Sequence, residues 1–120
     1  MFKKQNAAVL FTGIREEGIL NWRMIIVYLF RLTEFAKKHA DSRKSLATWQ
    51  DATERAIWKN KQDVLNNFPR AKMIENNKAR FEINHNKYRL IVFISYDTQT
   101  VFIRFIGTHT EYDRIDPETI

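Results

Sequence analysis

Five side chains that could act on a phosphodiester lie close together near the C-terminal end of the sequence. They are Lys87, Arg89, Arg104, His109 and Tyr112. Cleavage of RNA without a metal requires removal of a 2′-hydroxyl proton, stabilisation of a charged phosphorane and protonation of the leaving 5′-oxygen. Histidine and tyrosine can transfer these protons, and fixed arginine and lysine side chains stabilise the negative charge. The cluster therefore fits RNA cleavage, and it also fits RNA binding without cleavage.

The sequence offers little support for other chemistry. It has no cysteine, so a disulfide framework, a thiolate metal site and a cysteine nucleophile are excluded. Its three histidines, His39, His85 and His109, lack the spacing of a metal site. His39 is expected at a helix edge, in a structural or exposed position. His85 is expected in a turn, where it either contacts phosphate or is solvated.

Length and charge narrow the class of partner. The 120 residues suit one domain with a modest core. A net charge of +6 favours a polyanionic partner such as nucleic acid; the alternative is that the positive surface only promotes solubility. Every apolar run is far shorter than the roughly 18 residues that a transmembrane helix needs, so no contact with a membrane is predicted.

Hydrophobic periodicity predicts a strand followed by helices in the first half of the domain. The run of β-branched and aromatic residues at 24–30 predicts a buried strand. The first helical segment has Leu32, Phe35, Ala36 and His39 at helical spacing, with Thr33 as its predicted N-cap. The second runs from Arg43 to Trp58, after Asp41-Ser42. The third follows Asn60 and ends at Phe68-Pro69. Trp49 and Trp58 fit core packing better than base stacking.

From residue 71 the period changes from helical to extended. The predicted strands are 72–74, 79–83, 88–96 and 101–107, with a turn at Asn84-His85-Asn86. The order of strand, helices and strands predicts an α+β fold, in which the N-terminal strand and the helices pack on one face of an antiparallel sheet.

The register of the last hairpin decides where the two strand arginines point. The connection between the strands lacks glycine, which favours an even number of loop residues and predicts that Tyr96 lies opposite Val101. The residues expected to share one open face are then Arg89, Ile91, Phe93, Arg104 and Ile106, whereas Phe105 joins the apolar face that the helices cover. The alternative is that the two arginines only form salt bridges across strands to Glu82 or Glu111.

Residues 1–23 differ from the rest of the sequence. They hold two of the three glycines, Gly13 and Gly18, and show no sustained hydrophobic period. One domain is expected at residues 24–120, so the preceding segment is either a flexible extension or the product of a start codon assigned too far upstream. The apolar run Ala7 to Phe11 is short and charged residues follow it, so a secretory leader is not expected.

Four segments of the second half carry a recognisable pattern. They are Phe81-Glu82-Ile83, Asn86-Lys87-Tyr88-Arg89-Leu90, Val101-Phe102-Ile103-Arg104-Phe105 and Gly107-Thr108-His109-Thr110-Glu111-Tyr112-Asp113. With the helix that ends in Asn67-Phe68-Pro69, they resemble the HigB family of bacterial toxin components, which belongs to the wider RelE-like group of mRNA interferases. The pairing of Asn-Lys-Tyr-Arg with Thr-His-x-x-Tyr-Asp is the most specific part of the resemblance.

The resemblance implies a RelE-like small ribonuclease fold that cuts mRNA at the ribosomal A site, in the cytoplasm, without a metal or other cofactor. It also implies a cognate helix-turn-helix antitoxin of the HigA type. Carried over to matching positions, Arg89 and Arg104 bind the scissile phosphate with Lys87 nearby. His109 and Tyr112 transfer protons or orient the base, and which one acts as acid or base stays open.

Asn86 and His85 complete the expected RNA-binding set. Family members commonly have a glycine where this sequence has His85, so either the turn changes type or His85 adopts a strained backbone angle. The N-terminal extension is a second departure, which would alter contact with the antitoxin or the ribosome. The alternative functions are a non-catalytic RNA- or antitoxin-binding module on the same fold and a purely structural α+β domain.

Overall fold

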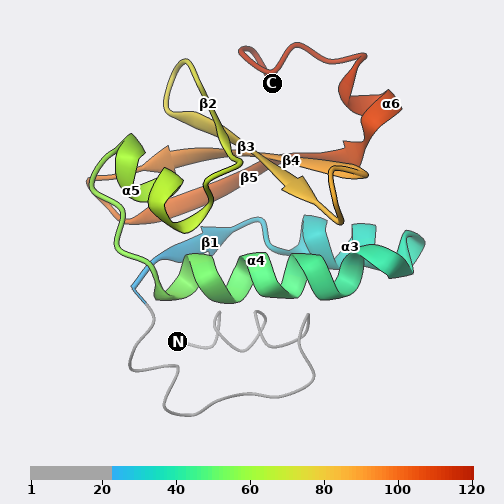
Figure 1. Ribbon diagram of the computed structural model, residues 1–120, viewed down its shortest axis with the longest axis horizontal. Helices are drawn as coiled ribbons and strands as arrows, with labels where there is room; N and C mark the ends of the chain where they lie inside the picture. Colours follow the sequence, from blue (N-terminus) through green and yellow to red (C-terminus); the bar gives the residue numbers. More distant parts are fainter. Residues whose placement is uncertain (1–22) are drawn as a thin grey trace.

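A computed structural model describes residues 23–120; the expectations for the segment that precedes them lie outside the described residues. The elements in chain order (Figure 1) are strand β1 (Ile25–Val27), helix α3 (Phe30–Lys38), a 3-10 turn (Ala40–Ser42), helices α4 (Arg43–Arg55) and α5 (Lys61–Asn67), strands β2 (Lys72–Ile74), β3 (Lys78–Ile83), β4 (Tyr88–Ser95) and β5 (Thr100–Thr108), and the short helix α6 (His109–Tyr112). The four strands of the second half agree with the predicted strands to within one residue at each end.

The strands form one five-stranded sheet in the order β1-β5-β4-β3-β2. The pairs β2–β3, β3–β4 and β4–β5 are antiparallel, whereas β1 pairs with β5 in parallel. The α+β class is therefore confirmed, but the sheet is mixed rather than antiparallel. The parallel pair arises because the whole helical segment lies between β1 and the meander, and a long crossover is what a parallel connection requires.

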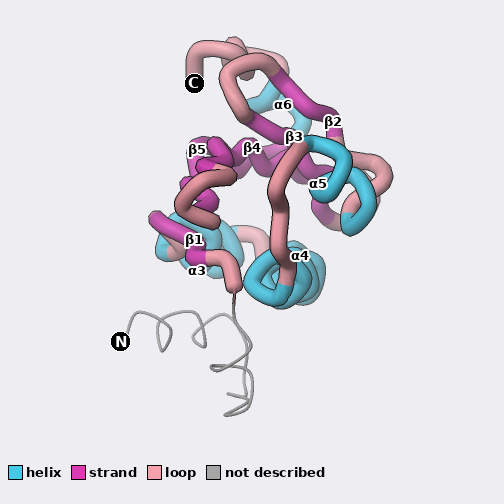
Figure 2. Tube along the Cα trace, turned by 90° about the vertical axis from the view of Figure 1, so that its left-hand side faces the viewer, coloured by secondary structure: helices cyan, strands magenta, loops and turns pink. Residues whose placement is uncertain are grey.

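Helices α3 and α4 cover one face of the sheet, and α6 with the C-terminal segment lies on the opposite side (Figures 1 and 2). The core between the helices and the sheet contains several side chains with no exposed surface, among them Leu32, Leu46, Trp58, Leu90, Val92 and Ile103. Full burial of a side chain of this size contributes about 1.5–3 kcal/mol. Trp49 and Trp58 both belong to this core, as predicted.

The first apolar run forms less strand than predicted. A strand does form within the predicted range, but β1 covers only three residues and Ile25 is half exposed, so the prediction was wrong in length and burial. Tyr28 has a φ of 68°, and Phe30 begins α3. Leu29 occupies the N-cap position without a side-chain bond, so Thr33 is not the cap. An apolar run suits a buried helix start as well as a strand, and composition does not separate the two.

Helices α4 and α5 occur in the predicted order, but α4 is shorter than predicted. Helix α4 ends at Arg55 because Ala56 is extended, and Trp58 lies in the following loop, where its Nε1 donates to Asn67 Oδ1 at 2.7 Å. The side chain of Asn60 accepts a hydrogen bond from the Asp63 amide. The predicted N-cap of α5 is therefore confirmed.

The β4–β5 connection has the even length predicted, but its register is shifted by two residues. Ser95 pairs with Thr100 and Ile94 with Val101, so Tyr96 belongs to the connection. Gln99 supplies the left-handed conformation that a glycine would otherwise provide, with a φ of 52°. Its side chain donates to the carbonyl of Trp58 at 2.6 Å and to that of Tyr96 at 2.8 Å, and accepts from the Trp58 amide at 3.2 Å.

A β-bulge in the β4–β5 pair changes the second half of β5. Val92 pairs with Ile103 and Ile91 with Phe105, so Arg104 is the extra residue. One added residue reverses the alternation downstream. Phe105 therefore joins the face of Ile91, and Ile106 packs against the core, which is the reverse of the prediction for these two side chains.

Replacing Gln99 by alanine is expected to lower the free energy of unfolding by about 1–3 kcal/mol, because the buried Trp58 amide and carbonyl lose their partners. Urea unfolding followed by tryptophan fluorescence measures the change. Thr98→Ala, in the same turn but with an exposed side chain, is the matched control, and equal losses in the two variants would contradict this role for Gln99.

Candidate functional site

Four cationic side chains of β3, β4 and β5 project from the sheet on the side away from α3 and α4. Lys78 and Arg80 pair with Phe93 and Ile91 in the β3–β4 register, and Glu82 pairs with Arg89. Alternate residues of a strand share a face, so Lys78, Arg80 and Arg89 point to the same side. Arg104 reaches this side from the bulge. We call Lys78, Arg80, Arg89 and Arg104 the cationic face.

Tyr112 contacts two of the four side chains of the cationic face. The guanidinium carbon of Arg89 is 4.8 Å from the centroid of the Tyr112 ring, and that of Arg80 is 5.7 Å from it. Arg89 Nε also donates to Asn86 Oδ1 at 2.9 Å. Of the residues predicted from sequence, the structure therefore brings together Arg89, Asn86 and Tyr112. Cation–π contacts of this kind hold each guanidinium in place and leave donor groups for a phosphate.

Helix α6 carries His109 and Tyr112, and a capping box at its N-terminus stabilises it. Thr108 and Glu111 form a reciprocal capping box, in which Glu111 Oε1 accepts from the Thr108 amide at 2.8 Å. A Cβ on Gly107 would lie 2.7 Å from that carboxylate oxygen and 2.6 Å from the Phe105 ring. Glycine at this position therefore leaves room for the box that starts the helix.

The imidazole of His109 lies on the exposed side of α6. Its Nδ1 is 3.2 Å from Asp113 Oδ2, and its side chain is about half exposed. An imidazole with a carboxylate neighbour and open access to solvent can exchange protons with a ligand. The structure thus places His109 and Tyr112 on the same short helix, but only Tyr112 contacts the strand arginines.

Arg104 and Arg89 lie on neighbouring strands but are not directly opposite each other. Gly107 is the partner of Arg89, and three residues of strand separate Arg104 from that position, which is about 10 Å. Its Nη2 donates to the carbonyl oxygen of Ile120 at 3.2 Å, and Lys78 Nζ donates to the same oxygen at 2.8 Å. The shared acceptor places Arg104 and Lys78 side by side.

The C-terminal segment covers part of the face that was predicted to be open. Lys78 Nζ also donates to the carbonyl of Glu118 at 2.7 Å, and Lys78 is only 6% exposed. Ile91, on the same face, is fully buried. Covering this face is favourable, because the C-terminal segment buries the apolar Ile91 side chain and removes its surface from water.

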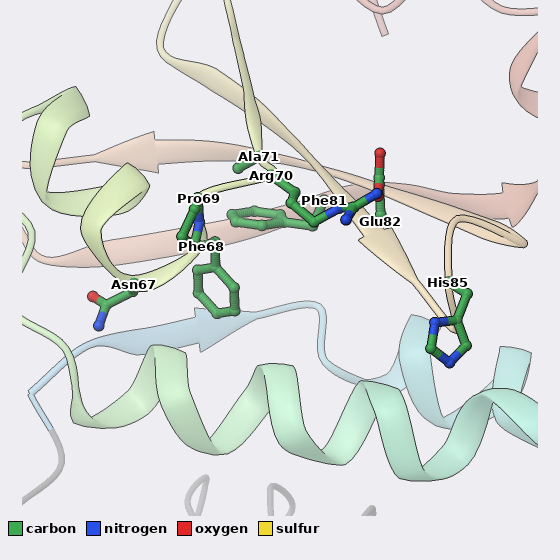
Figure 3. Close-up of a pocket in the computed structure, with 8 residues that line it drawn as sticks. All are labelled: Asn67, Phe68, Pro69, Arg70, Ala71, Phe81, Glu82 and His85. Atoms are coloured by element: carbon green, nitrogen blue, oxygen red, sulfur yellow. The ribbon is translucent and has the colours of Figure 1, made fainter.

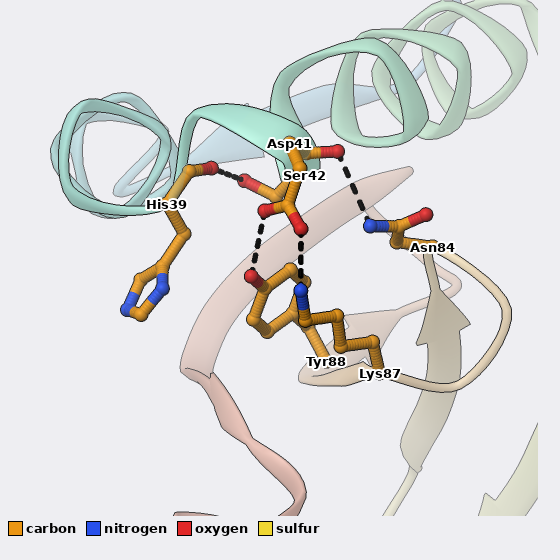
Figure 4. A network of polar contacts seen from close by, with 6 residues as sticks. All are labelled: His39, Asp41, Ser42, Asn84, Lys87 and Tyr88. Atoms are coloured by element: carbon orange, nitrogen blue, oxygen red, sulfur yellow. Dashed lines mark hydrogen bonds and ion pairs between the residues drawn. The ribbon is translucent and has the colours of Figure 1, made fainter.

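Lys87 faces the helices rather than the cationic face. Its Nζ lies 2.6 Å from Asp41 Oδ2, and the hydroxyl of Tyr88 donates to Asp41 Oδ1 at 2.6 Å (Figure 4). Asn84 Nδ2 donates to the Asp41 carbonyl. These contacts attach the β3–β4 hairpin to the junction between α3 and α4, and so position the strand that bears Arg89.

The same contacts shift three pKa values. The hydrogen bond from Lys87, and then that from Tyr88, lowers the pKa of the Asp41 carboxyl below its ordinary value. The hydrogen bond to Asp41 raises the pKa of Lys87, and likewise that of the Tyr88 phenol. The charged carboxylate is thus the form that the folded hairpin stabilises.

His85 occupies the tip of the hairpin in a left-handed conformation. Asn84, His85 and Asn86 have φ values of 55°, 56° and 72°, so His85 does adopt the strained angle that replacement of a glycine required. Its side chain lines a hollow of about 350 Å³ together with Phe68, Pro69 and other residues (Figure 3). It is not brought to Tyr112.

The glutamates considered as salt-bridge partners have other contacts. Glu82 Oε1 lies 3.1 Å from Arg70 Nε, and Glu111 belongs to the capping box of α6. Arg89 and Arg104 contact Asn86 and the Ile120 carbonyl instead. The side chains of the two strand arginines thus keep donors that a phosphate can accept.

Three residues of this arrangement were not predicted from the sequence. Lys78 and Arg80 alternate with apolar residues on the strand next to Arg89, and this alternation was the available signal for their place on the same face. The role of Asp41 had no comparable signal, because its partner Lys87 is distant in sequence.

No group of three or more histidine, cysteine, aspartate or glutamate side chains among residues 23–120 is placed to hold a metal ion. In the same part of the chain, no helix combines the length and apolarity needed to cross a membrane.

A family model described as HigB_toxin, the RelE-like toxic component of a toxin-antitoxin system, matches residues 42–115. The match spans more than half of the chain. It contains the whole β2–β5 meander together with α4, α5 and α6. No curated protein matches the chain.

Replacing Asp41 by asparagine is expected to destabilise the fold most near neutral pH. Because the folded state lowers the pKa of this carboxyl, its contribution is complete above the ordinary value of 3.8 and is lost as the pH falls through the lower folded value. The difference in unfolding free energy between parent and variant should therefore shrink below about pH 4. Urea titrations at several pH values measure it.

The matched background for this comparison is Lys87→Gln, which removes the first cause of the pKa shift. In that background Asp41→Asn should change stability less at neutral pH, as a double-mutant cycle reports. Identical effects with and without Lys87 would show that the two side chains are not coupled.

Proposed function

The chain belongs to the HigB family of RelE-like toxic components of toxin-antitoxin systems, and from that premise we propose that it is a ribosome-dependent mRNA endoribonuclease that works without a metal. Its substrate is translated mRNA in the ribosomal A site, in the cytoplasm. Its cognate partner is a helix-turn-helix antitoxin of the HigA type, which holds it inactive.

The observation that carries the proposal is the convergence of Arg80 and Arg89 on the Tyr112 ring. The two guanidinium groups provide a fixed positive environment next to a hydroxyl group that can transfer a proton. A phosphate bound there gains charge-assisted hydrogen bonds, and the negative charge of a phosphorane is stabilised by groups that need little rearrangement.

The proposed reaction is a transesterification. The 2′-oxygen loses its proton and attacks phosphorus, the bond from phosphorus to the 5′-oxygen breaks, and the leaving oxygen takes up a proton. The products are a 2′,3′-cyclic phosphate and a 5′-hydroxyl. Arg89 and Arg104 bind the phosphate, with Arg80 beside them, and Tyr112 and His109 are the candidates for the two proton transfers.

The remaining predicted residues have supporting parts in this proposal. Asn86 accepts a hydrogen bond from Arg89 Nε and so orients the guanidinium. Lys87 is engaged by Asp41, so we assign it the hairpin's attachment and a long-range attraction for RNA. We assign His85, at an exposed hairpin tip, a contact with RNA outside the cleavage site.

Arg89→Ala is expected to lower the rate of mRNA cleavage on ribosomes by about 10²–10³-fold, because one fixed donor to the phosphorane is lost. Induced expression of the variant should no longer arrest growth. Arg43→Ala, an exposed arginine at the start of α4, is the control with the same change of charge. Undiminished toxicity of Arg89→Ala would remove Arg89 from the site.

Tyr112→Phe and His109→Ala separate the two proton-transfer candidates. The variant that lacks a true proton-transfer group should lose about 10²–10⁴-fold in rate, and primer extension on ribosome-bound mRNA measures the cleavage. Parent-like rates for both variants would contradict the assignment of proton transfer to α6.

The alternative is a non-catalytic RNA- or antitoxin-binding module, for which the mixed basic and aromatic surface is also suited. Such a protein would bind RNA with a strong salt dependence and leave translated mRNA intact. Intact transcripts after induction of the parent chain would favour this alternative.

A further inference from the structure

A groove runs between α3 and the edge of β5. Strand β1 pairs only with Thr100–Phe102, so within residues 23–120 the following part of β5 has no neighbouring strand on that side. Arg31 Nη1 donates to the carbonyls of Ile103 at 3.2 Å and Arg104 at 3.4 Å, which fixes α3 beside this edge. The groove, of about 390 Å³, is lined by Phe30, Arg31, Glu34, Phe35, Lys38, Arg104, Phe105 and Ile106. We call it the edge groove.

Exposed aromatic rings border the edge groove. Phe30 is 61% exposed and Tyr28 is 45% exposed, which is unusual for rings of this size. The Tyr28 ring lies 6.4 Å from both Phe30 and Phe102, and Phe102 lies 5.9 Å from Phe93. The rings thus lead from the groove towards the strands that carry the cationic face.

The charge around the groove is predominantly positive. Arg31, Lys38 and Arg104 are exposed cations in its lining, and Arg31 also lies 5.0 Å from the Tyr28 ring. Glu34, the one acidic residue of this lining, pairs with Lys37 at 3.5 Å. Exposed rings interleaved with cations suit single-stranded nucleic acid, because bases stack on the rings while the cations follow the phosphates.

We propose that the edge groove binds a nucleotide of single-stranded RNA that neighbours the cleaved one, with its base against Phe30 and its phosphate near Arg31 and Lys38. The inference rests on the proposed function, because Arg104 belongs both to the groove and to the cationic face. An RNA strand that passes Arg104 therefore enters the groove without leaving the basic surface. The groove volume falls within the range of about 300–1,000 Å³ found for ligand pockets.

The test is binding of a fluorescein-labelled single-stranded RNA of about ten nucleotides, a length that spans several stacked bases, to the full chain without ribosomes. Fluorescence anisotropy at several salt concentrations gives the dissociation constant and its salt dependence. Phe30→Ala should raise the dissociation constant at least about fivefold through lost stacking, and Phe30→Trp should restore it. Lys38→Gln should reduce the slope of log affinity against log salt by about 0.7.

Two exposed residues elsewhere serve as matched controls. Ile57→Ala removes an apolar side chain that is 48% exposed, and Lys61→Gln removes an exposed lysine at the start of α5; both should bind RNA like the parent. Parent-like binding by Phe30→Ala overturns the inference. If that variant also escapes neutralisation by co-expressed antitoxin, the groove belongs to the protein partner.

Failure of the proposed function gives a different result. A parent chain that binds RNA through Phe30 but leaves translated mRNA intact would contradict the nuclease assignment and support the groove. A parent chain that cleaves mRNA while Phe30→Ala binds RNA and cleaves equally well would contradict the groove alone.

Discussion

The pairing of β4 with β5 is the constraint on which the rest of the structure depends. Leu90, Val92, Ile94, Val101 and Ile103, on one face of this pair, have no exposed surface, and α3 and α4 cover that face. The opposite face of the same two strands bears the arginines. A slip of one residue would exchange the two faces and bring a guanidinium into the apolar core, where an unpaired charge is strongly disfavoured. Core packing and the candidate site are therefore fixed by one register.

The bulge at Arg104 modifies this register at the place where the site needs it. The extra residue brings Arg104 to the side of Lys78, with which it shares the Ile120 carbonyl, and turns Phe105 towards Tyr112, at 6.4 Å between ring centroids. Bulges often occur next to functional sites because they redirect a side chain without breaking the sheet. Here the bulge also begins the stretch of β5 along which the edge groove lies.

Like charges gathered on one face oppose folding, and the cationic face holds four of them. Contacts with other groups offset this repulsion. Arg80 and Arg89 contact the Tyr112 ring, and Lys78 and Arg104 donate to a main-chain oxygen of the C-terminal segment. The neutral Tyr112 ring leaves the positive potential of Arg80 and Arg89 in place for an anion. Three successive residues with positive φ in the β3–β4 hairpin are a second local cost next to the same site, which is where such costs are commonly retained.

The sequence by itself determined the four strands of the second half, the α+β class, the N-cap at Asn60 and the inventory of candidate groups, because period-two alternation and capping act between residues close in the chain. It also placed Arg89 and Arg104 on one face. It did not reveal the bulge, the parallel place of β1, the contact of Lys87 with Asp41 or the convergence of Arg80 on Tyr112. These features were decided by the tertiary structure, since they join residues such as Asp41 and Lys87 or Arg80 and Tyr112 that lie far apart in the chain. Local pattern carries no information about such pairs; packing and hydrogen bonding between the assembled elements select them.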